Sequence, residues 1–268
     1  MVEREPTAVR RIAVALDATP HCLPGLALAT QIAAALSAEI EGVFIEDTEL
    51  LRMAGLPFLR ELRATTLGES TLDKARLQRE LRAAARGARA QVERSAGEFG
   101  IAWSFRVWRG DLEADILDAA RDAEFFALGR IGRFAPLRRR PKAAPRGIPS
   151  GSLTIGALFD GTAAATRALA TAQALAEHRD AARLVVILQS GSVADAATLG
   201  AAARRQLAGL HERVALVDLG ALAATAAGRT AATAGIGLLV VAAANPLLTS
   251  PSPWTGLEAF DCPILIAR

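Results

Sequence analysis

Aromatic residues are scarce in this sequence: they make up 4% of its 268 residues, whereas hydrophobic residues as a whole make up 51%. The core must therefore be built mostly from alanine, leucine, valine and isoleucine. Such side chains suit helices packed on a parallel sheet better than a β-sandwich. The composition thus favours an α/β fold, and the length favours two domains over one.

Cysteine and histidine are also rare. Cys22 and Cys262 are too few for a disulfide framework and lack the spacing of a metal site, and three scattered histidines do not supply one, so no metal is predicted. His21 precedes Cys22, but neighbouring side chains diverge at a helix start and no third group orients the histidine. We therefore predict no catalytic residue here, and a cytoplasmic chain with buried or half-buried thiols.

Long apolar runs are missing, because Arg, Glu or Asp interrupts every candidate membrane span. The first eleven residues carry charges of both signs and no apolar segment, which argues against a secretory signal. The net charge is +3, yet residues 133–146 carry six basic residues and no acidic one. The rest of the chain is not basic, which disfavours nucleic-acid binding. We interpret the basic run as a solvated linker, with contact to phosphate or to an acidic partner as the alternative.

Strands and helices alternate in the first half of the chain. Apolar runs predict strands at residues 11–16, 40–45, 103–108 and 124–128. Helical spacing and capping signals predict helices at 23–36, 50–54, 72–99 and 112–122. This order implies a parallel sheet with right-handed crossovers. Four prolines and the basic run then disfavour helix or strand over residues 134–151.

The second half repeats the layout. Strands are expected at 153–159, 183–188, 213–217, 238–242 and 263–267, with helices at 163–176, 195–210 and 222–234 and a short helical turn at 257–260. ALDAT at 15–19 matches LFDGT at 158–162, and FFALGRIG at 125–132 matches LLVVAAAN at 238–245. A repeat of this length predicts two similar domains, 10–133 and 152–268, joined by a basic, proline-rich linker at 134–151. The first domain has no counterpart of the last strand, so we predict that it is truncated by a helix and a strand.

Residues 125–133, FFALGRIGR, form the strongest candidate for a ligand site. The apolar run stops at Gly129, and Gly132 follows three residues later. Parallel sheets bind ligands beyond the carboxyl ends of their strands, where glycine lets a phosphate or ribose approach the backbone. Arg130 and Arg133 could neutralise phosphate charge. The alternative is an ordinary turn flanked by exposed arginines.

The first predicted strand ends in Asp17-Ala18-Thr19. Asp17 could bind a ribose or an adenine edge, or it could form an Asx turn or a helix N-cap. Asp160 has the same two interpretations, and the structural one is favoured there because no glycine loop faces it. Glu46 and Asp47 are adjacent carboxylates that point to opposite faces of a strand, so an acid–base pair is not expected.

Together, these motifs resemble the universal stress protein family, in particular its tandem two-domain members. The resemblance rests on the two strand-Asp-x-Thr turns, on FFALGRIGR, on LLRMAGLPF at 50–58 and on the terminal DCPILIAR. It implies doubly wound α/β domains of the adenine-nucleotide-hydrolase-like type, some of which bind ATP. Asp17 would lie by the adenosine, and Gly129 and Gly132 would form the first part of a phosphate loop. The cofactor-binding residues so implied are Asp17, Thr19, Gly129, Arg130, Gly132 and Arg133, with ATP or AMP as the ligand.

The sequence departs from the family pattern in two places. Members that bind ATP carry Gly-Ser or Gly-Thr about nine residues after the first glycine pair, whereas Lys142 stands ten residues beyond Gly132 here. In the second half, Ala242 and Asn245 replace both glycines. We therefore expect weak binding of ATP or AMP in the first domain. The second domain is expected to bind no nucleotide, to complete the pseudo-dimer interface and to lend its last strand.

We accordingly predict a cytoplasmic, non-enzymatic binding or signalling module of the stress response. One alternative is a nucleotide-free interaction or scaffold protein with an unknown protein partner. A second is an enzyme that hydrolyses ATP or transfers adenylate, disfavoured because no placed base, metal-binding carboxylate set or complete glycine loop is present. A homodimer through residues 264–267 is a further hypothesis, since an unpaired edge strand invites a partner.

Overall fold

The computed structural model describes residues 10–17, 22–54, 56, 60–62, 69–71, 74–110, 123–128, 153–178, 182–220, 224–249, 260 and 262–268. The first half contains β1 (Arg11–Leu16), α1 (Leu23–Leu36), β2 (Glu39–Asp47), α2 (Thr48–Met53), β3 (Arg60–Leu62), β4 (Glu69–Thr71), α3 (Lys74–Phe99), β5 (Trp103–Gly110) and β6 (Phe125–Leu128). The second half contains β7 (Thr154–Phe159), α5 (Ala163–Glu177), β8 (Arg183–Leu188), α6 (Val193–Gln206), the 3₁₀ segment η2 (Ala208–Arg213), β9 (Val214–Asp218), α7 (Ala224–Thr233), β10 (Leu238–Ala242), α8 (Pro246–Thr249) and β11 (Ile264–Ala267).

Most predicted elements are confirmed. β1, α1, β8 and β10 begin and end at the predicted residues, because each is an apolar segment bounded by charged or turn residues. The predicted helix at 195–210 is shorter: α6 ends at Gln206, and the chain continues as η2. The β3–β4 hairpin and α8 were not predicted. The predicted helix at 112–122 and the linker at 134–151 lie outside the described residues, and so does the predicted turn at 257–260 except for Phe260.

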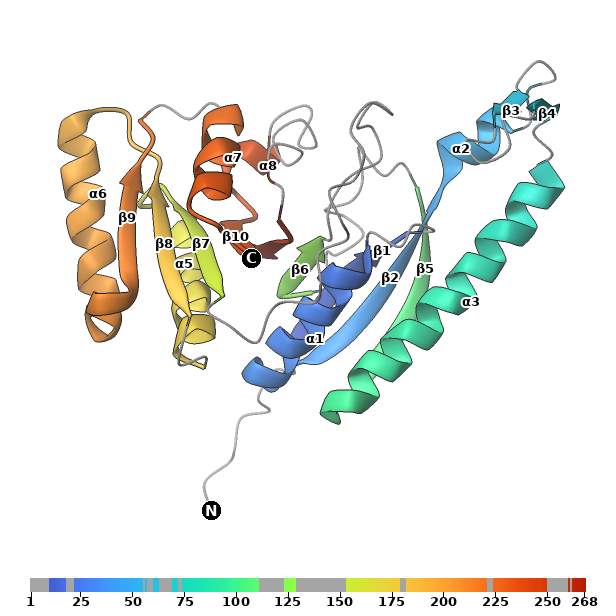
Figure 1. Cartoon of the computed structure of the whole chain (residues 1–268), viewed down its shortest axis with the longest axis horizontal. Coiled ribbons are helices and arrows are strands. Elements are labelled where there is room, and N and C mark those ends of the chain that lie inside the picture. Colours follow the sequence, from blue (N-terminus) through green and yellow to red (C-terminus); the bar gives the residue numbers. More distant parts are fainter. Residues whose placement is uncertain are drawn as a thin grey trace.

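The nine main strands form one sheet in the order β5-β2-β1-β6-β11-β10-β7-β8-β9 (Figure 1). The order of the first half, β5-β2-β1-β6, is repeated in reverse as β10-β7-β8-β9. Neighbours within each half are parallel, whereas β6 and β11 are antiparallel. The strands of the two halves therefore run in opposite directions. The carboxyl ends of the first-half strands lie at the same end of the sheet as the amino ends of the second-half strands.

β11 joins the two halves. Ile264 is paired with Leu239 of β10 on one side and with Leu128 of β6 on the other. The expectation that the second half lends its last strand is thereby confirmed. The hypothesis of a homodimer through residues 264–267 is wrong, because this strand is not an edge: it is hydrogen-bonded on both sides inside the sheet. The edge strands are β5 and β9.

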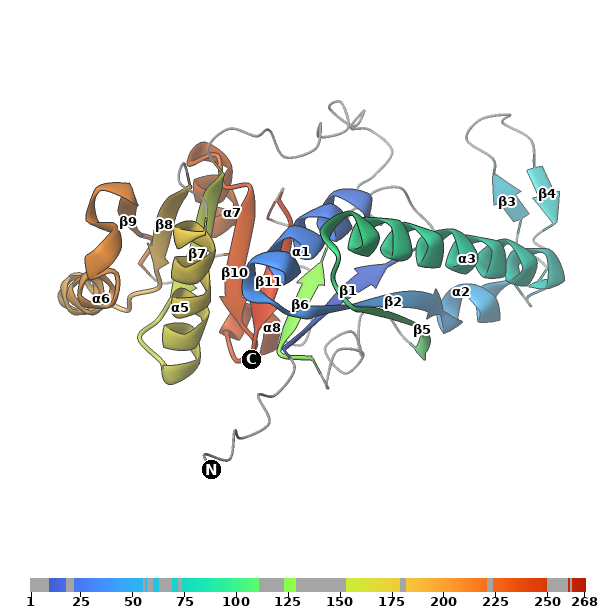
Figure 2. The ribbon, with the colours of Figure 1, turned by 90° about the horizontal axis from the view of Figure 1, so that it is seen from below.

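Helices pack on both faces of the sheet. Side chains of β1 alternate between the two cores: Ile12 and Val14 belong to one, Ala13 to the other. The first core includes residues of α1, α3, α5 and α6, and the second includes residues of α7 and α8. α1 contacts α3 and also α5 of the other half, and α3 lies along β2 and β5 (Figure 2). Within the described ranges, no helix is both long and apolar enough to cross a membrane.

α3 approaches β2 closely at Gly42. A Cβ atom on that residue would lie 2.7 Å from Cγ2 of Val92 and 3.0 Å from Cδ2 of Phe105. Such contacts are too short for any side chain, so only glycine fits without movement of the helix. The first turns of α3, at the other end of the helix, lie beside the carboxyl ends of β2 and β5.

Candidate functional site

The two motifs singled out in the first half follow neighbouring strands. β1 and β6 are parallel, with Val14 paired to Ala127. β1 leads to β2 on its other side, so the chain order reverses between β1 and β6. Such a switch point is where open α/β sheets bind ligands, beyond the carboxyl ends of the strands. The motifs that begin at Asp17 and at Gly129 follow directly from these two ends.

Asp17 is the candidate residue that the structure describes at this edge. It comes directly after β1 and is partly exposed. Its carbonyl oxygen lies 3.9 Å from Sγ of Cys22, which acts as the donor. Burial raises the pKa of the Cys22 thiol, so the thiol is protonated at neutral pH and is a poor nucleophile. Thr19, Gly129, Arg130, Gly132 and Arg133 lie outside the described residues, and so does His21.

The corresponding turn of the second half has a structural role. Oδ1 of Asp160 accepts hydrogen bonds from the backbone N–H of Thr162 at 2.9 Å and from its hydroxyl at 2.7 Å. The Thr162 hydroxyl in turn accepts from the N–H of Ala165 at 3.1 Å and caps α5. The favoured interpretation of Asp160 as a turn residue is confirmed.

Beyond the carboxyl ends of the second-half strands, two side chains are joined by a hydrogen bond. Nδ2 of Asn245, which follows β10, donates to Oε1 of Gln189, which follows β8, at 2.6 Å. β7 lies between β10 and β8, so this bond passes over the end of β7. Asn245 is 1% exposed, and its Oδ1 also accepts from the N–H of Leu247 at 3.1 Å. Asn245, which stands in the sequence repeat where the first half has Gly132, is therefore already engaged in hydrogen bonds within the chain.

A third polar group lies at the end of β9. Oδ1 of Asp218 accepts from the N–H of Gly220 at 3.0 Å and from the hydroxyl of Ser190 at 2.7 Å. These bonds, that from Gly220 foremost, hold the pKa of Asp218 below its ordinary value. In the described ranges, no three His, Cys, Asp or Glu side chains are grouped so that they could hold a metal ion.

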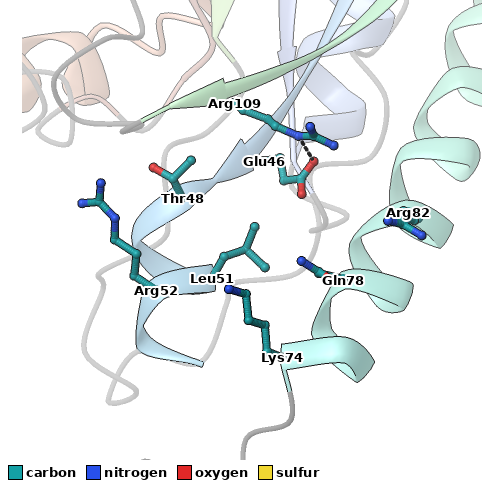
Figure 3. Close-up of a pocket in the computed structure, with 8 residues that line it drawn as sticks. All are labelled: Glu46, Thr48, Leu51, Arg52, Lys74, Gln78, Arg82 and Arg109. Carbon is teal, nitrogen blue, oxygen red and sulfur yellow. Dashed lines mark hydrogen bonds and ion pairs between the residues drawn. The ribbon is translucent and has the colours of Figure 1, made fainter. Parts of the chain in front are cut away.

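A cleft of about 460 Å³ lies beside the carboxyl ends of β2 and β5, between α2 and α3 (Figure 3). Most of its lining side chains are basic or polar: Glu46, Thr48, Leu51, Arg52, Lys74, Gln78, Arg82 and Arg109. Arg109 donates from Nε to Oε2 of Glu46 at 3.0 Å. The Glu46 side chain is 12% exposed and that of Arg109 is 69% exposed, so the carboxylate of the pair is buried and the guanidinium is accessible.

Sequence reasoning did not find this cleft. It treated Glu46 together with Asp47 as a carboxylate pair, whereas the partner of Glu46 is Arg109, its register neighbour on β5. One signal was available: Lys74, Gln78 and Arg82 stand four residues apart and therefore share a helix face.

No protein-family model and no curated protein matches this chain. A universal stress protein from Archaeoglobus fulgidus DSM 4304 has a similar structure, with a TM-score of 0.58 at 12% identity over 96% of each chain. The chain has the fold of the universal stress proteins.

Two further structures of universal stress proteins are similar at lower scores. A putative universal stress protein from Pseudomonas aeruginosa UCBPP-PA14 aligns over 97% of this chain and 93% of its own, with 14% identity and a TM-score of 0.46. A universal stress protein in complex with cAMP aligns over 43% of this chain and 96% of its own, with 18% identity and a TM-score of 0.36. The fold assignment rests on the A. fulgidus structure.

The two candidate regions of the first half lie beyond different strands of the sheet. The switch point, which Asp17 borders, lies beyond β1 and β6. The basic cleft lies instead at the ends of β2 and β5, next to the sheet edge. The two regions use different residues, so variants can test them separately.

Proposed function

We propose that this chain is a universal stress protein-like binding module that takes up ATP or AMP beyond the carboxyl ends of β1 and β6. The observation that carries the proposal is the parallel pairing of β1 with β6, with Asp17 directly at the end of β1. Asp17 and Thr19 would contact the adenosine. The backbone at Gly129 and Gly132 would approach the phosphates, and Arg130 and Arg133 would neutralise their charge.

In this proposal the second half has a structural role and binds no nucleotide. The hydrogen bonds of Asp160 with Thr162 and of Asn245 with Gln189 support this, because these side chains are already engaged at the equivalent edge. The proposal includes a cytoplasmic location and the absence of enzymatic activity. Since β11 is paired on both sides, a homodimer formed by strand pairing in the nine-stranded sheet would use the edge strand β5 or β9.

Calorimetric titration of ATP and of AMP tests the proposal. The matched variants are Asp17→Asn and Asp160→Asn, which change the same residue in the two repeated turns. We expect Asp17→Asn and Gly129→Val to weaken nucleotide binding at least about tenfold, because each removes a contact to the ligand or blocks its approach. Asp160→Asn should bind like the unchanged chain.

Two outcomes contradict the proposal. No heat from either nucleotide, with a normal circular dichroism spectrum, points to the nucleotide-free scaffold, which the missing Gly-Ser pair at Lys142 favours. Equal weakening by Asp17→Asn and Asp160→Asn places the nucleotide elsewhere. A steady release of phosphate from ATP that Asp17→Ala abolishes would instead identify an ATP-hydrolysing enzyme.

A further inference from the structure

We propose that the cleft between α2, α3 and the carboxyl ends of β2 and β5 binds a small phosphorylated molecule. It is a second site in the first half, separate from the nucleotide site proposed above. Its lining contains four basic side chains, from α2, α3 and β5, and one acidic side chain. Three different elements therefore bring positive charge to one concave surface.

Among the described residues that line the cleft, basic side chains outnumber acidic ones by four to one. Glu46, the acidic member of the lining, is already bonded to Arg109. In the part of the chain that the structure describes, no carboxylate lies within 4 Å of Lys74 or Arg82. Arg76, outside the cleft on the same helix, differs in this respect, because its Nε donates to Oε1 of Glu80 at 2.9 Å. Like charges gathered in a cleft raise the local concentration of anions.

The arrangement of donors suits a phosphate group. Lys74, Gln78 and Arg82 lie on successive turns of α3, and Figure 3 shows the ends of Lys74 and Gln78 in the space between α2 and α3. Arg109 adds a guanidinium from the strand side. Arginine and lysine are the side chains that most often bind phosphate, arginine through paired N–H donors and lysine as a point charge.

The cleft also offers apolar surface. Leu51 of α2 lines it next to the basic side chains. Small-molecule sites combine such surface with a few placed polar groups. We therefore infer an organic phosphate whose carbon part rests on Leu51 while its phosphate faces Lys74, Arg82 and Arg109. Arg52 points away from these residues in Figure 3, so we assign it no contact with the ligand.

A substitution of Glu46 should change anion binding in the opposite direction to the loss of a basic side chain. Its carboxylate orients Arg109 but also places a negative charge in the lining. Glu46→Gln keeps the size of the side chain and removes that charge. Anion binding should therefore become a few-fold tighter in Glu46→Gln, whereas loss of basic side chains should weaken it.

The experiment is calorimetric titration of inorganic phosphate and of pyrophosphate, the two probes that carry the proposed chemistry alone. The test variant is Lys74→Ala/Arg82→Ala. The control is Arg86→Ala/Arg94→Ala, which removes the same charge from exposed positions of the same helix outside the cleft. We expect pyrophosphate binding to weaken at least about tenfold in the test variant and less than about twofold in the control. All four side chains are exposed and alanine favours helix, so both variants should fold.

Three results would overturn the proposal: no binding of either probe at millimolar concentration, equal weakening in the test and control variants, or binding that Asp17→Asn abolishes while Lys74→Ala/Arg82→Ala does not. The second would mean that only the general charge of α3 attracts anions. The third would place the phosphate at the nucleotide site. Conversely, failure of ATP to bind at Asp17 leaves the pyrophosphate result intact, so the two proposals fail separately.

Discussion

Leu128, the last residue of β6, pairs with Ile264, the first residue of β11, across the antiparallel ladder that joins the two halves. Both side chains are buried, with exposed fractions of 1% and 2%, and both belong to the same core. A sheet edge that the first half would otherwise expose is covered in this way. The two halves should therefore unfold together.

Ile264→Lys should destabilise the protein by more than about 4 kcal/mol, because it buries an unpaired charge in the middle of the sheet. Ile264→Ala, which leaves only a cavity, should cost about 2–5 kcal/mol and keep the protein folded enough to measure. Urea unfolding followed by circular dichroism gives both values.

The control for this position is Ala215→Lys in the edge strand β9, where the side chain is exposed. It should change the stability by no more than about 0.5 kcal/mol. If Ile264→Ala were as mild as Ala215→Lys, β11 would not hold the halves together. Two well-separated unfolding transitions in the unchanged chain would also contradict the shared sheet.

Gly42→Val should destabilise the protein by about 1–3 kcal/mol, because a Cβ atom there would lie 2.7 Å from Cγ2 of Val92 and would push α3 away from β2. Gly87→Ala, in the same helix, should instead stabilise the protein. A Cβ atom at Gly87 meets nothing within 4 Å, and alanine stabilises a helix interior by about 0.5–1 kcal/mol relative to glycine. Thermal unfolding of the two variants should move the midpoint in opposite directions. A shift of the same sign would refute the packing argument.

Asp218 should titrate below the ordinary carboxyl pKa of about 3.9. Its pKa is lowered first by the N–H of Gly220 and then by the hydroxyl of Ser190, both of which favour the charged form. A lowered pKa in the folded state means that Asp218 adds stability above the unfolded pKa, and that this stability is lost as the pH falls through the folded pKa.

NMR titration of the Asp218 carboxyl carbon measures this shift. Ser190→Ala should raise the midpoint only part of the way, since the larger contribution comes from Gly220. Thr198→Ala removes a hydroxyl that bonds to its own helix, and it should leave the midpoint of Asp218 unchanged. A midpoint at or above the ordinary value in the unchanged chain would contradict the two hydrogen bonds.

Asn245→Ala should cost about 1–3 kcal/mol, because it leaves the N–H of Leu247 and the side chain of Gln189 without this buried partner. Gln206→Ala removes an amide that bonds to the carbonyl of Thr166 at the surface, so its effect should stay within about 0.5 kcal/mol. Urea unfolding compares the two. If both substitutions changed the free energy of unfolding by the same small amount, the hydrogen bonds of Asn245 would not stabilise the strand ends of the second half.

Local pattern was enough to predict most of the elements. The apolar runs of β1 and β10 and the helical spacing of α1 are complete within a few residues, and each is bounded by charged or turn residues. The Asp-x-Thr motif occurs twice in the sequence, and the structure confirms that Asp17 and Asp160 each directly follow a largely buried strand. The bounds of these strands and helices could be predicted because they depend on residues that are close together in the sequence.

Tertiary structure decided what depends on neighbours in space. β3 and β4 are three residues each, and their pairing, not their composition, makes them strands. The pairing of Ile264 with Leu128 and the ion pair of Glu46 with Arg109 join segments far apart in sequence, so no periodicity records them. Sequence patterns alone were enough to predict an α/β chain whose two halves repeat the same order of strands, with a candidate nucleotide site after the first and fourth strands. Only the folded sheet decided that the halves share β11, and that basic side chains from α3 and β5 gather in one cleft, because strand order and helix packing set which distant residues meet.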